Sequence, residues 1–172
     1  FRNLLPYTLE VAMGLETAHP EVLKRLNKRM TLDLFAASAK SLRVQGIDLR
    51  AFILVQPPFM KPDESLHWAQ RSLDFAFDCG ATAASLIPAR GGNGAMETLK
   101  RTGDFVPPRL ATLESAIDYG IGLRRGRVFS DLWDIQRASP VCAHCFPARI
   151  ERLAEVNLQQ RVLAAIECTQ CE

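Results

Sequence analysis

The feature that most constrains the fold is the alternation of short apolar runs with amphipathic segments between residues 9 and 88. Apolar runs at 9–15, 48–55 and 81–88 have the length of buried strands. Between these runs, apolar residues recur at helical spacing. Near-continuous apolar strands joined by helices are typical of a parallel sheet with right-handed crossovers. The sequence therefore predicts an α/β fold.

The predicted helices have residues at their ends that favour helix initiation or termination. Pro20 suits the first helical position, where its missing N–H is not needed. Thr31 is a residue type that caps helices, and Pro62 begins a long helix that ends at Gly80. Two shorter helices are expected at 95–102 and 110–121, with glycines from Gly120 onward breaking the second, followed by a last strand or extended segment at 128–133.

Polar residues follow the three predicted strands. Glu16 ends the first strand, Gln56 follows the second, and Arg90 belongs to a glycine-rich loop after the third. Because the carboxyl ends of parallel strands share one edge, where α/β folds bind ligands, we expect these residues to lie along that edge. The alternatives are a capping or solvated role for Glu16 and a plain turn for the glycine-rich loop.

Two Cys-x-x-Cys pairs near the carboxyl terminus predict a metal site. The pairs are Cys142 with Cys145 and Cys168 with Cys171, separated by 22 residues. Four thiolates can close a tetrahedral site around zinc, with the intervening helix held by the metal. An iron–sulfur cluster, disulfides, independent thiols, and a site in which His144 replaces one cysteine are the alternatives.

Composition and charge narrow the function classes. The chain of 172 residues is 48% hydrophobic with a net charge of +2, so no bulk field favours nucleic acid or a membrane surface. No apolar run approaches the roughly 18 residues of a membrane span. The basic cluster at 124–127 is either a solvated turn or a phosphate or RNA contact.

Residue 1 is Phe, and we expect the chain to be the carboxyl-terminal part of a longer protein. The paired cysteines favour the reducing cytoplasm over secretion.

Residues 11–17 (Val-Ala-Met-Gly-Leu-Glu-Thr), with 21–23 and Leu26-Asn27-Lys28, resemble the fourth βα unit of radical S-adenosylmethionine enzymes. The similar branch contains the Elongator catalytic subunit, the methylthiotransferases and oxygen-independent coproporphyrinogen oxidase. Residues 53–58, 86–97 and 107–110 resemble a subgroup near the radical subunit of archaeosine synthesis. The resemblance implies that Glu16 approaches bound S-adenosylmethionine, that Lys28 approaches its methionyl carboxylate, and that Arg90 lies near the cofactor.

The sequence also departs from that family. The Cys-x-x-x-Cys-x-x-Cys loop that holds the family's 4Fe-4S cluster is absent, as are the first strands of the barrel. The four tail cysteines cannot replace that loop, because two Cys-x-x-Cys pairs would fill every position of a cluster that needs an open iron. Lys28 stands where the family usually has arginine, and a lysine lacks the planar two-pronged donor that arginine offers to a carboxylate.

These observations lead to two hypotheses. The first is the carboxyl-terminal half of a partial (β/α)6 TIM-like barrel at residues 1–126, followed by a metal-binding tail at 127–172. Its parent would use S-adenosylmethionine and a 4Fe-4S cluster, held by the missing amino-terminal half, to form a 5′-deoxyadenosyl radical, with a tRNA base as substrate precedent. The chain alone would be inactive. The second is a non-catalytic α/β module with a zinc-stapled tail that binds RNA or protein.

Overall fold

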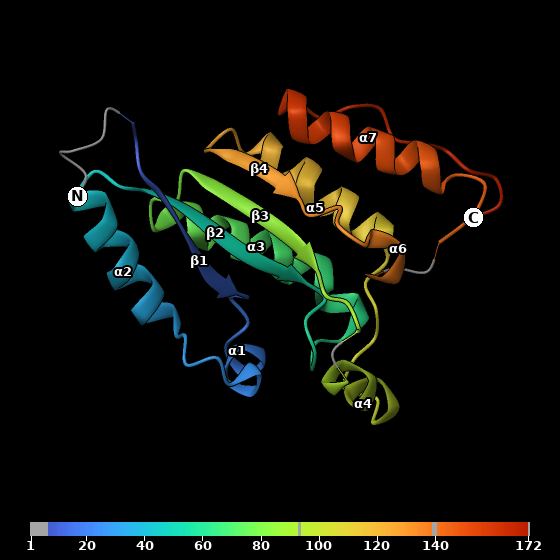
Figure 1. Ribbon diagram of the computed structural model, residues 1–172, viewed down its shortest axis with the longest axis horizontal. Coiled ribbons are helices and arrows are strands. Elements are labelled where there is room, and N and C mark those ends of the chain that lie inside the picture. The colour runs from blue at the N-terminus through green and yellow to red at the C-terminus, as the bar shows by residue number, and fades with distance from the viewer. Residues whose placement is uncertain (1–6, 93, 139–140, 172) are drawn as a thin grey trace.

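The four strands of the protein form one parallel sheet in the order β1-β2-β3-β4 (Figure 1). The computed structural model describes residues 7–92, 94–138 and 141–171, so Asn93 of the glycine-rich loop and residues 1–6 lie outside it. The predicted α/β class and parallel pairing are confirmed. The strands are β1 (Glu10–Glu16), β2 (Asp48–Val55), β3 (Ala83–Pro88) and β4 (Arg127–Ser130).

The helices begin where the sequence signals predict. Pro20 is the first residue of its helix, and the Thr31 hydroxyl accepts a hydrogen bond from the Leu34 N–H at 3.1 Å. No helix in the described part of the chain is long and apolar enough to cross a membrane. The helical elements are α1 (Pro20–Leu26), α2 (Leu32–Val44), the 3-10 helix η2 (Pro62–Glu64), α3 (Ser65–Asp78), α4 (Ala95–Arg101), α5 (Leu110–Gly122), α6 (Ile135–Ala138) and α7 (Phe146–Gln159).

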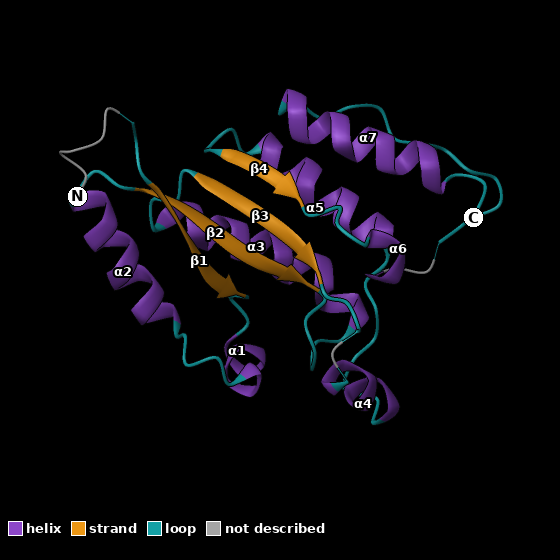
Figure 2. Cartoon of the chain, in the orientation of Figure 1, coloured by secondary structure: helices purple, strands orange, loops and turns teal. Residues whose placement is uncertain are grey.

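Helices cover only one face of the sheet. Along β2, Leu49, Ala51, Ile53 and Val55 are buried and alternate with more exposed residues such as Phe52. The buried side packs against α2, α3 and α5; in Figure 2, α3 and α5 lie behind the sheet and α2 lies beside β1. No described helix lies over the opposite face. The sheet therefore has a core side and an uncovered side.

The uncovered side carries a charged network that spans the sheet. Glu10 of β1 accepts hydrogen bonds from Arg50 of β2 and Arg127 of β4, each at 2.7 Å. The Arg50 guanidinium also lies 4.7 Å from the ring centroid of Phe129. Arg127 belongs to the basic cluster at 124–127, and Arg125 pairs with Asp78 at 2.7 Å. Two arginines of that cluster are thus engaged within the fold.

The sequence pattern predicted that Gly120 breaks the helix, and this prediction is wrong. The helix continues to Gly122, and Gly120 is buried within it. A Cβ at this position would lie 3.0 Å from atoms of both Leu73 and Val128. The missing side chain therefore lets α5 approach α3 and β4 closely, which a sequence pattern cannot distinguish from helix breaking.

The last strand is shorter than predicted. β4 ends at Ser130, and residues 131–134 lead into the short helix α6, which the sequence analysis did not predict. Ile135 and Ala138 of α6 are buried against the main core. β4 pairs with β3, so the sheet extends beyond residue 126, where the sequence placed the end of the barrel part.

The outer edge of β4 is covered by two amide side chains from α7 and its carboxyl end. Asn157 accepts from the Ser130 N–H at 2.8 Å and donates to its carbonyl at 2.9 Å. Gln160 does the same for Val128, at 2.8 and 2.9 Å. The two amides thus take the place of a fifth strand and satisfy backbone groups that an open edge would expose.

We predict that replacing Gln160 with leucine destabilises the fold. The substitution leaves the Val128 N–H and carbonyl without partners, which costs about 1–3 kcal/mol. Urea unfolding should show a lower free energy of unfolding for Gln160→Leu and for Asn157→Leu. The neighbouring exposed variant Gln159→Leu is the matched control, and equal stabilities of Gln159→Leu and Gln160→Leu would contradict the edge-covering role.

Candidate functional site

Glu16 lies at the carboxyl end of β1 in an unusual backbone conformation. Its φ is +67°, and the pairing of β1 with β2 shifts register between Gly14 and Glu16. The irregularity turns the carboxylate back over β1, so that a Cβ on Gly14 would lie 2.5 Å from the Glu16 Oε1. The Gly-x-Glu pattern therefore has a steric reason: only glycine at position 14 leaves room for this carboxylate.

Lys28 contacts the same carboxylate. Its Nζ lies 3.0 Å from Oε1 of Glu16, whose side chain is 12% exposed while that of Lys28 is 54% exposed. Lys28 lies just after α1, between two residues in the left-handed conformation, Asn27 and Arg29. The structure therefore places two of the three predicted cofactor residues in contact with each other.

Gln56 and Arg90 lie at the same edge, after β2 and β3, with partners of their own. The buried Gln56 amide donates to the Met60 carbonyl at 2.8 Å and so holds its own loop. Arg90 forms an ion pair with Asp131, and its guanidinium lies 5.1 Å from the ring centroid of Trp133. The predicted common edge is confirmed by the strand order. Among the described contacts, however, none joins Glu16, Gln56 and Arg90 directly.

The four tail cysteines form a group that could hold a metal such as zinc. The sulfur atoms of Cys142, Cys145, Cys168 and Cys171 all lie within 4.8 Å of one another. Tetrahedral zinc at about 2.3 Å from each sulfur requires sulfur separations of about 3.8 Å. The sulfurs of Cys145 and Cys171 are 3.5 Å apart. All four are free thiols, so the disulfide alternative is not what the structure contains, and His144 is not part of the group.

The path of the chain explains the long spacer between the two cysteine pairs. α7 has 14 residues and advances about 21 Å from Cys145. Gln160 then adopts a left-handed conformation, and residues 161–167 return beside the helix over about the same distance. Arg152 of α7 donates to the carbonyls of Leu163 and Ala164, each at 2.8 Å, and fixes this return. The spacer thus has the length that one helix and its extended return require.

The thiols have different environments. Backbone N–H groups of Cys145 and His144, together with the Cys171 thiol, lower the pKa of Cys142 to about 6, the Cys145 N–H having the largest effect. The Cys142 and Cys145 sulfurs beside Cys171 raise its pKa to about 12. A turn that directs N–H groups at a sulfur stabilises the thiolate, which is the form that ligates metals.

Arg149 connects the cysteine group to the core. Arg149 lies one helical turn after Cys145, close enough for that cysteine to contribute, after Glu114, to raising its pKa, and its guanidinium holds the Glu114 carboxylate of α5 with Nε at 3.0 and 3.1 Å from the two oxygens. Glu114 raises the pKa of Arg149 further above its usual range. A fixed cation beside a sulfur ligand orients that ligand and stabilises its charge.

Sequence reasoning missed several of these residues, although signals for them exist. Asp131 and Trp133 follow β4 in the way that Glu16 follows β1, so the same edge argument would have identified them. Arg149 lies four residues after Cys145, on the same face of α7. Glu114 has no local signal, because its role depends on how α5 packs against α7.

No protein-family model matches this sequence, and no curated protein matches it. Membership of the radical S-adenosylmethionine family stays a prediction from the sequence resemblance.

We predict about one equivalent of bound metal in the purified protein. Replacing both Cys145 and Cys168 with serine should abolish it, because each pair loses a ligand. Metal analysis by mass spectrometry measures the stoichiometry, and replacing Cys79, at the end of α3, is the control that should retain the metal. A metal-free wild-type tail whose protease resistance is unchanged by a chelator would contradict a metal role.

Arg149→Gln is expected to weaken metal binding by roughly 10- to 100-fold, because Cys145 loses the cation that orients its sulfur. Competition with a chromogenic chelator measures the affinity. Arg161, an exposed arginine on the return segment, provides the matched Arg161→Gln control. Equal affinities for the two variants would assign Arg149 to helix packing alone.

Proposed function

We propose that this chain forms the carboxyl-terminal part of a radical S-adenosylmethionine enzyme, with a structural zinc site in its tail. The observation that carries the proposal is the Glu16–Lys28 pair at the carboxyl edge of a parallel sheet covered on one face. The resemblance of residues 11–28 to the family's fourth βα unit gives the same two residues their roles.

The strand order supports a partial barrel. Sequential parallel strands with right-handed crossovers put every helix on one side of the sheet, whereas doubly wound sheets reverse their order and carry helices on both sides. Here the order is β1-β2-β3-β4, and the described helices leave one face open. A sheet of this kind continues into a barrel when further strands are added.

Sheet curvature supports the same architecture. Glu10 and Arg127 lie on the first and last strands, which in a flat sheet would be about 14 Å apart. Their side chains nevertheless meet at 2.7 Å over the uncovered face. The long arginine and glutamate side chains together with a concave uncovered face would close this distance. Because α7 covers the edge of β4, further strands would join at β1, whose outer edge pairs with no described strand.

The Glu16–Lys28 pair suits the amino acid part of S-adenosylmethionine. A carboxylate and an ammonium group 3.0 Å apart complement a zwitterion, which presents an ammonium and a carboxylate of its own. Lys28 would hold the methionyl carboxylate, and Glu16 would lie beside the ammonium group. When bound to a reduced 4Fe-4S cluster, the cofactor supplies a 5′-deoxyadenosyl radical that abstracts hydrogen from a substrate.

The cluster would come from outside these residues. The chain has no Cys-x-x-x-Cys-x-x-Cys motif, and its paired cysteines lie next to each other in the tail. We therefore expect the chain alone to be inactive. The tail metal would be zinc with a structural role, since it joins the two ends of a segment that α7 attaches to the sheet. The precedent of the subgroup makes a tRNA base the expected substrate.

Two observations test the proposal. The coding sequence upstream of Phe1 should contain Cys-x-x-x-Cys-x-x-Cys. Its absence would favour the second hypothesis, a non-catalytic α/β module with a zinc-stapled tail that binds RNA or protein.

In the protein that contains the cluster, Glu16→Ala should weaken S-adenosylmethionine binding. Loss of a charge-assisted hydrogen bond costs roughly 1.5–3 kcal/mol, about ten- to a hundredfold in affinity. Isothermal titration calorimetry measures the dissociation constant. Glu21→Ala, which removes an exposed acid from α1, is the control and should leave it unchanged. An unaltered constant for Glu16→Ala would return Glu16 to a purely structural role.

A further inference from the structure

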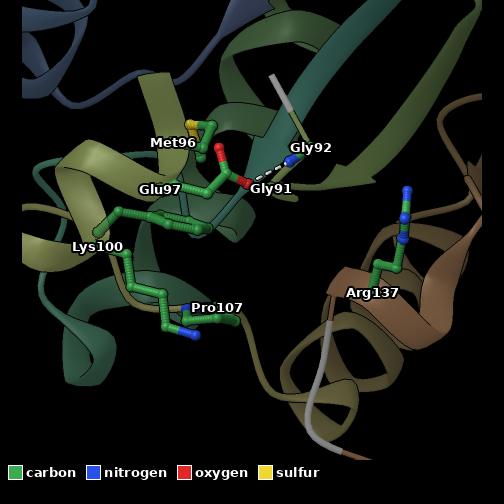
Figure 3. Close-up of a pocket in the computed structure, with 8 residues that line it drawn as sticks. Gly91, Gly92, Met96, Glu97, Lys100, Pro107 and Arg137 are labelled. Carbon is green, nitrogen blue, oxygen red and sulfur yellow. Dashed lines mark hydrogen bonds between the residues drawn. The ribbon is translucent and has the colours of Figure 1, made fainter. Parts of the chain in front are cut away.

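A pocket of about 300 Å³ lies beside Arg90 at the carboxyl edge of the sheet. Its walls come from the loop after β3, from α4 and from α6, and include Gly91, Gly92, Lys100 and Arg137. Figure 3 shows Lys100 and Arg137 on opposite sides of the pocket, with the end of the Lys100 side chain beside Pro107. The pocket lies after β3 and β4, whereas the Glu16–Lys28 pair follows β1. It is therefore a separate part of the edge.

Among its described lining residues, the pocket has two basic side chains, Lys100 and Arg137, and one acid, Glu97. Glu97 accepts a hydrogen bond from the Gly92 N–H at 2.6 Å, and this contact lowers the Glu97 pKa. Arg137 pairs with Asp134 at 3.3 Å through one nitrogen and is 68% exposed. Among the described residues, the Lys100 side chain has neither an ion pair nor a hydrogen bond. Lys100 and Arg137 can therefore both contact an anion.

An exposed aromatic platform stands next to this pocket. Trp133 is 74% exposed, and its backbone N–H donates to Asp131 at 3.0 Å. Asp131 also pairs with Arg90, whose guanidinium backs the indole ring at 5.1 Å from its centroid. The indole is thus supported from one side and open to solvent. Arg90 leads directly into Gly91 of the pocket, and Trp133 lies in the turn just before α6, four residues before Arg137.

We infer that this edge binds a nucleotide, with the base stacked on Trp133 and the phosphate between Lys100 and Arg137. Exposed aromatic rings bind nucleobases by stacking, and Lys and Arg side chains bind phosphate. A ligand with a flat ring at one end and an anion at the other satisfies both features. If the proposed function holds, the bound nucleotide would be the substrate of the reaction, and this part of the inference rests on the proposed function. The binding itself requires neither a cluster nor S-adenosylmethionine.

NMR of the whole ¹⁵N-labelled chain tests the inference. The chain has two tryptophans, so two indole N–H signals are expected, and Trp133→Phe assigns them. Guanosine 5′-monophosphate at millimolar concentration should shift the Trp133 indole signal and the Gly91 and Gly92 amide signals. A short single-stranded RNA tests whether the nucleotide is recognised within a polymer. Binding of either ligand at these signals supports the inference, and the absence of both shifts overturns it.

Variants separate the two contacts. Trp133→Ala should weaken binding of guanosine 5′-monophosphate by roughly five- to a hundredfold, as loss of one stacked base does. Lys100→Gln with Arg137→Gln should weaken guanosine 5′-monophosphate but not guanosine. Tyr7→Ala and Lys40→Gln, exposed residues away from this edge, are the matched controls. An unchanged dissociation constant for Trp133→Ala, with a folded spectrum, would refute the stacking contact and the inference with it.

Discussion

The hydrogen bonds between two amide side chains and the edge of β4 determine how the two parts of this chain fit together. Asn157 and Gln160 each make a donor and an acceptor bond to one residue of the strand. These contacts satisfy the sheet edge, which would otherwise be open to pairing with another chain. They also fix α7, at whose start Cys145 stands. The position of the cysteine group therefore follows from the requirement that the last strand be paired.

The chemistry of the sheet follows from its one-sided winding. Because the helices bury one face, the polar residues of the other face contact each other, as Glu10 does with Arg50 and Arg127. Because all strands run the same way, the loops after them gather at one edge. Glu16 and Arg90 lie there, and both are held by neighbours that leave part of the edge for a ligand.

Local patterns predicted the elements of this fold, and contacts between distant segments decided the rest. Pro20 and the bounds of β2 could be predicted because each depends on a few neighbouring residues. The cysteine group could be predicted because two knuckles carry a ligand spacing of their own. Gly120 was misinterpreted, since helix breaking and close packing use the same residue. The roles of Gln160 and Glu114 depend on partners about 30 residues away, for which one sequence contains no signal.

The cysteine group and the carboxyl edge are neighbours in the sequence, because α6 ends at Ala138, four residues before Cys142. Before α6, the Asp131 N–H donates to the Leu86 carbonyl at 2.8 Å. Ile135 and Ala138 of α6 are buried against the core, and Arg137 of the same helix lines the pocket. A segment fixed at both ends has fewer conformations than one fixed at one end. A metal bound to Cys142 would fix the chain shortly after α6, as the Asp131 hydrogen bond fixes it shortly before, and a site that stabilises the tail would thereby help to keep Trp133 and Arg137 at the edge where a ligand would bind.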